Sequence, residues 1–183
     1  WVALARQFLK LLLATMSDEG IHLAIDDTVT LRASKKAPGS KIHHQHGNKP
    51  NLAQYVRGQG WVSLAMVVKR TDAQAIALPL LSRLIPSVSN TGKLIAANTL
   101  IRSVYRLFEG RTVRVLVDSW FMRRRFIESM EQRNFEVIGQ ARIDTRLYDE
   151  PPPRKKGQRG RPRKYGDKYT PKRIAHIKRT EAT

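Results

Sequence analysis

Two acidic positions interrupt runs of apolar residues that have the character of β-strands. Asp26 and Asp27 lie within the run 21–31, and Asp118 follows the β-branched run 112–117. Burying a carboxylate among aliphatic side chains is costly unless a positive group meets it. Two carboxylates held close together also repel each other, and a divalent cation such as Mg²⁺ or Mn²⁺ relieves that repulsion. The pattern indicates a metal site, which would suit attack of a water or hydroxyl on a phosphodiester.

Both acidic positions also have a structural interpretation. Asp118 followed by Ser119 is a typical N-cap for a helix at 121–133, because Asp and Ser are preferred at that position. Asp27 followed by Thr28 could be a solvent-facing pair on an edge strand. The residues alone therefore leave a catalytic and a structural role open for these acids.

The hydrophobic periodicity predicts the elements that position the acids. Helices are expected at 2–16, 90–108 and 123–133, and strands at 21–31, 61–68, 73–81, 112–117 and 136–141. Three strands in succession predict an antiparallel meander, and the helix at 90–108 then crosses to a parallel fourth strand. The expected fold class is a mixed α/β sheet, with Asp26 and Asp118 on neighbouring strands at its centre.

Several local features follow from the same patterns. The segment 32–60 is polar and rich in Pro and Gly, so it is expected to be a loop. Pro79 predicts that the third strand either lies at an edge of the sheet or ends there. The run 112–117 is typical of a strand buried on both faces. The apolar face of the first helix is expected to consist of Leu4, Phe8, Leu11, Leu12 and Met16.

Three histidines, His43, His44 and His46, lie in the expected loop. Their clustering raises the possibility of zinc, but no cysteine or carboxylate lies nearby at ligand spacing. A polar loop whose histidines contact phosphate or nothing is the favoured interpretation. The chain has no cysteine at all, which excludes disulfides and thiolate metal sites.

The charge of the chain indicates a polyanionic partner. Thirty-four Lys and Arg stand against fifteen Asp and Glu, a formal net charge of +19. Residues 151–183 alone hold twelve basic and two acidic side chains. No apolar run is long enough to span a membrane, which leaves nucleic acid ahead of a membrane surface as the partner. We therefore expect DNA as the partner and a cytoplasmic, nucleoid-associated location.

Two groups of basic residues are candidates for DNA contact. Arg123, Arg124 and Arg125 follow Asp118 closely and could bind phosphates near a scissile bond, although a solvated helix face explains them equally well. After residue 148 the chain becomes rich in Pro, Gly, Lys and Arg, which predicts an extended basic arm. Within it, the segment 159–164 resembles the Arg-Gly-Arg-Pro core of an AT-hook, whose arginines enter a narrow minor groove. A linker or non-specific phosphate contact is the alternative, and the candidate residues are Arg159, Arg161, Arg163 and Lys164.

Several segments together resemble the catalytic domain of bacterial insertion-sequence transposases of the DDE type. They are Leu-Ala-Ile-Asp-Asp-Thr (23–28), Lys-Ala-Pro-Gly-Ser-Lys-Ile-His-His-Gln-His-Gly-Asn-Lys-Pro-Asn (36–51), Gly-Gln-Gly-Trp-Val-Ser-Leu (58–64), Val-Leu-Val-Asp-Ser-Trp-Phe (115–121), Val-Ile-Gly-Gln-Ala-Arg-Ile-Asp-Thr-Arg-Leu-Tyr (137–148) and Gly-Arg-Pro-Arg-Lys-Tyr-Gly (160–166). The similarity covers roughly residues 20–170. The order and spacing of these segments together are more specific than any one of the segments.

The resemblance implies an RNase H-like fold and a metal-dependent DNA strand cleavage and transfer reaction on transposon ends. It places the first acid on Asp26, with Asp27 as the second choice, and the second acid on Asp118. Both would bind Mg²⁺ or Mn²⁺. The family's third acid is a glutamate on a later helix, and no position here matches it. Glu128, Glu131 and Glu181 all lack the expected context.

The predicted organisation is an N-terminal helix at 1–19, an incomplete catalytic core at 20–149 and a basic arm, or the start of an insertion, at 150–183. Because Trp1 opens within a predicted helix, we expect a fragment whose intact form could be a homo-oligomer. Whether this chain is an enzyme therefore stays open. A non-catalytic DNA-binding remnant held by its basic arm is the alternative function.

Overall fold

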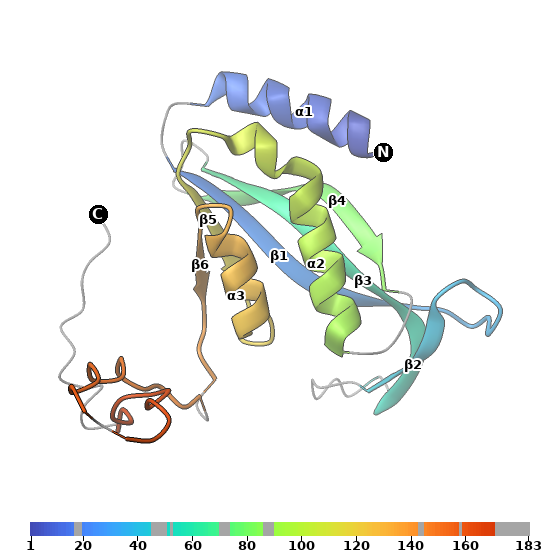
Figure 1. The fold of residues 1–183 in the computed structure, drawn as a ribbon. Coiled ribbons are helices and arrows are strands. Elements are labelled where there is room, and N and C mark those ends of the chain that lie inside the picture. Colours follow the sequence, from blue (N-terminus) through green and yellow to red (C-terminus); the bar gives the residue numbers. More distant parts are fainter. Residues whose placement is uncertain are drawn as a thin grey trace. The chain divides into compact units, whose positions relative to one another are not determined.

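The fold is built on a mixed sheet. The structure is a computed structural model, and it describes residues 1–16, 20–44, 51, 53–69, 74–85, 90–142, 145–157 and 159–170. Its contacts divide the chain into two compact units, Trp1–Gln140 and Ala141–Thr183. The elements of the first unit are α1 (Val2–Thr15), β1 (Ile21–Leu31), β2 (Ser40–His44), β3 (Tyr55–Lys69), β4 (Ala75–Leu84), α2 (Asn90–Val104), the 3₁₀ helix η1 (Tyr105–Phe108), β5 (Val113–Val117), α3 (Arg124–Glu131) and β6 (Phe135–Gly139). Figure 1 shows their arrangement.

The described strands form one sheet with the order β2-β3-β1-β5-β6, and β4 also pairs with β3. Strands β1, β3 and β4 are an antiparallel meander, whereas β5 lies parallel to β1 and β6 lies parallel to β5. The crossover from the meander to β5 runs through α2. This arrangement confirms the predicted mixed α/β sheet.

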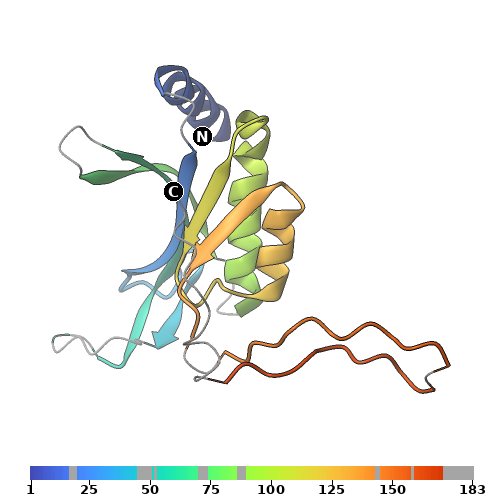
Figure 2. The same ribbon diagram turned by 90° about the vertical axis from the view of Figure 1, so that its left-hand side faces the viewer.

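One face of the sheet carries the core and is covered by α2 and α3 (Figure 2). Alternate residues of β1 and β3 are buried on this face, among them Leu23, Ile25, Leu64 and Met66. Because β-strand side chains alternate between faces, the residues between them point to the other side. This alternation separates Asp26 from Asp27 and therefore decides what each of them can contact.

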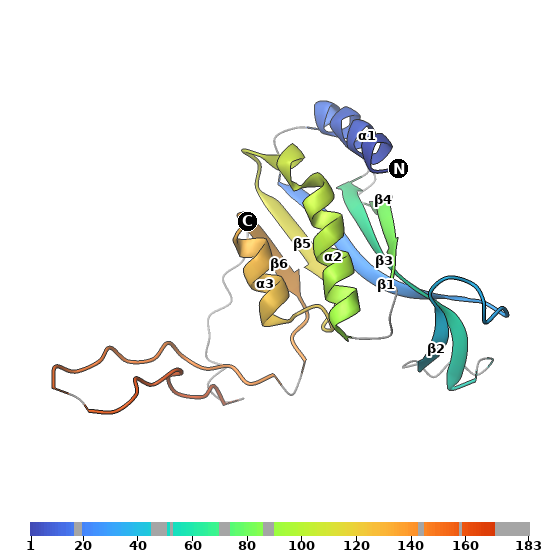
Figure 3. The ribbon, with the colours of Figure 1, turned by 45° about the vertical axis from the view of Figure 1, so that its right-hand side comes forward.

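The face with which the first helix packs matches the prediction only in part, since Leu12 and Met16 pack against the core but Phe8 is exposed. The buried residues of α1 are Ala5, Leu9 and Leu13, whereas Leu4 is 63% exposed and Leu11 is 69% exposed. Apolar residues occur nearly all round this helix, so the sequence pattern did not specify which stripe the body covers. Figure 3 shows α1 at the end of the sheet where β1 and β5 begin.

The expectation of a loop over 32–60 is confirmed for residues 32–39 but was wrong for residues 40–44 and 55–60. Strand β2 occupies Ser40–His44, and β3 begins at Tyr55 rather than at residue 61. Gly58 and Gly60 are strand residues of β3, and Gly58 lies where two backbones approach closely. A Cβ built on Gly58 would lie 2.6 Å from Val29 Cγ1 and 2.7 Å from the Thr30 carbonyl oxygen, so this strand position requires glycine.

The fifth strand is buried mainly on its helix-covered face, not on both faces as predicted. Val113 and Val115 are fully buried, but Arg114 is partly exposed and its Nε lies 2.9 Å from Glu136 Oε2 on β6. Pro79 does lie in a strand paired only with β3, beside an irregularity in the β3–β4 register. No helix in the described part of the chain is long and apolar enough to cross a membrane.

The second unit, Ala141–Thr183, contains two extended segments that lie antiparallel to each other. An isolated bridge pairs Tyr148 with Lys168, and the Tyr169 backbone N–H donates to the Leu147 carbonyl at 2.9 Å. The rings of Tyr148 and Tyr165 stack with centroids 5.0 Å apart. Nearly all its described side chains are exposed, as the composition of the arm led us to expect. Residues 171–183 of the predicted arm lie outside the described residues.

Candidate functional site

The parallel pairing of β1 with β5 places Asp26 and Asp118 at corresponding positions. The last pair of the register joins Ile25 to Val117, and each acid is the residue that follows one member of this pair. Adjacent strands lie about 4.8 Å apart, so the two carboxylates leave from neighbouring backbones. Both residues are exposed. The two acids are therefore close in register and accessible to a ligand from solvent.

Asp118 holds the turn that follows β5. Its Oδ1 accepts hydrogen bonds from the backbone N–H groups of Trp120 at 2.9 Å and Phe121 at 3.2 Å. The prediction that Asp118 caps the next helix was wrong, since α3 begins at Arg124 and its N-cap is Arg123 without a side-chain bond. One carboxylate oxygen thus fixes the turn, while in the described residues nothing bonds the other.

Asp26 and Asp27 face opposite sides of the sheet. Asp26 pairs with Ser63, and its Oδ1 accepts the backbone N–H of Asp27 at 2.8 Å. Asp27 pairs with Val62 on the helix-covered face, where its Oδ2 lies 2.7 Å from Lys93 Nζ. Lys93 supplies the positive partner that a partly buried carboxylate requires. Asp27 therefore has a structural partner already, whereas Asp26 is open to solvent.

Lys93 also connects β1 with the turn that carries Asp118. Its Nζ lies 4.8 Å from the centroid of the Trp120 ring, within the range of a cation–π interaction. A single lysine in α2 thus contacts both the Asp27 carboxylate and the residue two positions after Asp118. Sequence analysis missed Lys93, because only the tertiary crossover brings the beginning of α2 to this place.

The described residues offer two carboxylates for a metal rather than a complete set. In the ranges that the structure describes, no group of three His, Cys, Asp or Glu side chains is placed to hold an ion. Glu128 is instead 2.6 Å from Arg124 within α3. Mg²⁺ commonly binds through one or two carboxylates and keeps several waters. Asp26 and Asp118 fit the oxygen chemistry of that ion as a partial site.

Three arginines lie beside the Asp118 turn. The Arg123 guanidinium carbon is 5.7 Å from the Trp120 ring centroid, and its Nε is 3.4 Å from the Trp120 carbonyl oxygen. Arg124 and Arg125 are exposed in the first turn of α3. The candidate arginines of the arm, together with Lys164, are also exposed but belong to the second unit.

The described histidines are strand residues and form no metal site. His43 Nε2 lies 3.1 Å from the Gly58 carbonyl oxygen, and the His44 ring makes an edge contact with Tyr55 at 5.1 Å between centroids. His46 lies outside the described residues. The interpretation of this segment as a loop was therefore wrong for His43 and His44.

Removing the charge of Lys93 is expected to destabilise the site. Lys93→Met should lower the free energy of unfolding by about 1–2 kcal/mol, between the values for exposed and buried ion pairs. The Lys93 and Asp27 side chains are 30% and 16% exposed. Urea unfolding of Lys93→Met, Asp27→Asn and the double variant gives the coupling energy, with Lys93→Arg as the charge-preserving control. Strictly additive losses would show that the ion pair contributes nothing.

The chain matches known proteins at the level of a family and of solved structures. A family model described as DDE superfamily endonuclease matches residues 1–183. A search of curated proteins finds no match. The piggyBac transposase synaptic complex with hairpin DNA is 14% identical, over 69% of this chain and 24% of that chain, with a TM-score of 0.37. The pre-cleavage Mos1 transpososome is 13% identical, over 76% and 42% of the two chains, also with a TM-score of 0.37. The chain spans less than half the length of either.

Proposed function

The chain belongs to the DDE superfamily endonucleases, and from this premise we propose that it provides Asp26 and Asp118 as metal ligands for DNA strand cleavage and transfer. The observation that carries the proposal is the register of the two central parallel strands. It places these exposed acids at corresponding positions after Ile25 and Val117. The finer assignment, a transposase of an insertion sequence acting on its own DNA ends, is part of this proposal.

Each residue of the site has a distinct part in the proposed reaction. A bound Mg²⁺ or Mn²⁺ would supply the positive charge that activates the attacking water or hydroxyl and stabilises the leaving oxygen. Asp118 keeps one oxygen on the turn and presents the other, and Asp26 presents its carboxylate from β1. Arg123 and Arg125 hold phosphates of the DNA beside the turn, where a cation contributes affinity without reading the base sequence. A third carboxylate has to come from outside the described residues.

Substitution of the first acid tests the proposal in the full-length protein. Asp26→Asn is expected to abolish nicking of DNA in Mg²⁺, because an amide is a much weaker ligand than a carboxylate for a hard cation. The matched variant Asp27→Asn, one residue away, should keep most of the activity, since Asp27 is bound by Lys93. Nicking of a supercoiled plasmid bearing the element's ends measures both. Undiminished nicking by Asp26→Asn would refute the assignment.

A non-catalytic DNA-binding role for the chain is the second candidate, and the exposed basic arm favours it. The backbone of the arm is extended, and Gly160 has a φ of +95°. The side chains of Arg159 and Arg161 are exposed to solvent. Such an arm binds DNA mainly through phosphates, with a steep dependence on salt. Loss of nicking in Asp26→Asn and Asp118→Asn, with nicking retained in Asp27→Asn, would favour catalysis over this second role.

A further inference from the structure

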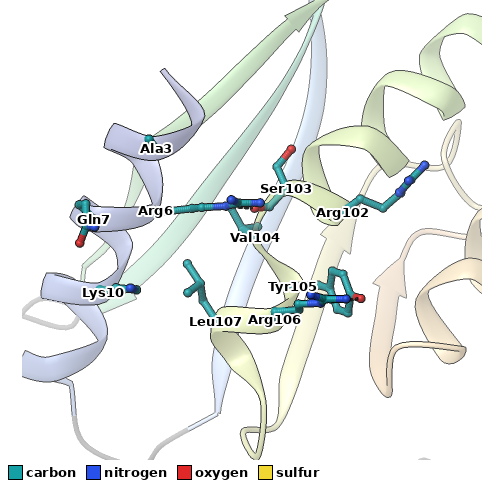
Figure 4. Close-up of a pocket in the computed structure, with 10 residues that line it drawn as sticks. All are labelled: Ala3, Arg6, Gln7, Lys10, Arg102, Ser103, Val104, Tyr105, Arg106 and Leu107. Atoms are coloured by element: carbon teal, nitrogen blue, oxygen red, sulfur yellow. Dashed lines mark hydrogen bonds between the residues drawn. The ribbon is translucent and has the colours of Figure 1, made fainter.

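A basic cavity of about 630 Å³ lies between α1 and the junction of α2 with η1, away from the carboxylates (Figure 4). Its four ionisable cations are Arg6 and Lys10 from α1, Arg102 from α2 and Arg106 from η1. Tyr105 provides an aromatic side chain between them. No acidic residue lines the cavity. All four cations are exposed to solvent.

The cations of this cavity form no salt bridge in the described part of the chain, although Glu109 acts electrostatically on Arg106. The negative end of the α2 dipole favours a cation at Arg102 in the last turn, but it accounts for that residue alone. Four like charges around one cavity repel one another, and a bound anion would remove this cost.

Hydrogen bonds to neutral acceptors hold the cavity walls in place and leave the positive charges of the arginines unneutralised. Arg6 Nε donates to the Ser103 carbonyl oxygen at 2.6 Å and so fastens α1 to the end of α2. Arg106 Nε donates to the Tyr105 hydroxyl at 3.3 Å, which raises the pKa of Arg106 and keeps it charged. Figure 4 shows Arg6 reaching from α1 towards Ser103, with Arg106 beside Tyr105. The guanidinium groups therefore retain free N–H donors.

A second, smaller cavity of about 250 Å³ adjoins the first cavity at Tyr105. It shares Tyr105 and Arg106 with the first cavity and adds Arg111 and Arg133, together with one acidic residue, Glu109. The Arg133 guanidinium carbon is 5.5 Å from the Tyr105 ring centroid. Nη1 of Arg111 is buried without a hydrogen-bond partner. The same guanidinium donates from Nη2 to the Leu13 carbonyl oxygen at 3.4 Å, so Arg111 contributes its positive charge to the cavity wall.

We propose that the two adjoining cavities form a second DNA-binding site, which takes phosphates of the DNA backbone at the end of α2 opposite Lys93. The choice of DNA as the polyanion rests on the proposed function. Guanidinium groups suit phosphate because two N–H donors can bind two oxygens at once. Lys93 and Arg102 are nine residues apart, about 13 Å along the helix axis. The cavities therefore lie away from the end of α2 that carries Lys93, and DNA bound there would be held in addition to any DNA at Asp26 and Asp118.

Salt-dependent binding tests the proposal in the whole 183-residue chain. Fluorescence anisotropy with a 20-base-pair duplex gives the slope of log Kd against log salt. Arg102→Gln with Arg106→Gln should reduce the magnitude of that slope by about 1–2, because each phosphate contact contributes about 0.9. The matched variant Lys69→Gln with Arg83→Gln removes the same charge from exposed positions of β3 and β4. It should keep the slope of the original chain.

Site-specific cross-linking gives a readout that does not depend on affinity or cleavage. The chain has no cysteine, so Gln7→Cys introduces a single attachment point in the cavity wall for a photoactivated cross-linker. Duplex DNA should be captured at position 7. The control Ala77→Cys, on the exposed part of β4, should capture much less. Thermal unfolding of all variants checks that each of them is folded.

The outcomes separate this proposal from the proposed function. Equal slopes for the two double variants, or equal capture at positions 7 and 77, would overturn the second DNA site even if the acids prove catalytic. Binding of inorganic pyrophosphate that depends on Arg102 and Arg106, without DNA capture at position 7, would also overturn it. Conversely, capture at position 7 together with undiminished nicking by Asp26→Asn would leave this site standing and remove the catalytic assignment.

Discussion

Asp118→Asn is expected to lower metal-dependent DNA cleavage by about a thousandfold while leaving the fold intact, because a metal ligand supplies several kcal/mol of transition-state stabilisation. The Asn side chain keeps an oxygen that can accept the N–H groups of Trp120 and Phe121, as Asp118 Oδ1 does at 2.9 and 3.2 Å. The turn should therefore survive, and only the charge should be lost. Plasmid nicking in Mg²⁺ by the full-length protein measures the effect.

Asp118→Ala separates the two roles of this residue. Alanine removes both the charge and the acceptor of the turn, so it should also cost about 1–2 kcal/mol of unfolding free energy, as the loss of a cap does. Urea unfolding of the 183-residue chain compares the two variants. If Asp118→Asn destabilises as much as Asp118→Ala, the turn depends on the charge. If Asp118→Asn still nicks DNA, Asp118 is a structural residue only.

The central strands could be predicted from sequence because their patterns are local. Strand β1 was expected at 21–31 and has those bounds. The helix at 90–108 appears as α2 followed by η1, and it makes β5 parallel to β1 as the crossover rule requires. The proximity of Asp26 and Asp118 in register followed from topology alone. Their assignment as metal ligands stays a prediction.

The features that escaped prediction depend on contacts between distant segments. Gly58 suggested a loop, but its missing side chain admits the backbone of β1 at Thr30. The buried stripe of α1 was misassigned in part because Leu4 and Leu11 have the same apolar character as Leu9 and Leu13. In the sequence, nothing distinguished Lys93 from any other polar residue at the beginning of a helix. Its pairing with Asp27 arises only when the crossover has formed.

Phe121→Ala is expected to cause the largest loss of stability near the site, about 3–5 kcal/mol, as for other buried aromatic truncations. Phe121 is fully buried in the core. Its ring lies 5.1 Å from that of Trp120 and 6.0 Å from that of Phe126, measured between centroids. The matched variant Phe121→Leu keeps most of the volume and should cost less than about 1.5 kcal/mol. Urea unfolding gives both values.

A double-mutant cycle connects this core residue to the chemistry of the turn. The Phe121 backbone N–H donates to Asp118 Oδ1, so the packed ring and the carboxylate hold the same four-residue turn from its two ends. Residues that share such a contact show coupling energies of about 0.5–3 kcal/mol. Asp118→Ala combined with Phe121→Ala should therefore destabilise by less than the sum of the two single effects, because the first loss already loosens the turn. Additive losses would mean that the ring packs independently of the turn, and the position of Asp118 would then depend on its own hydrogen bonds and not on the core.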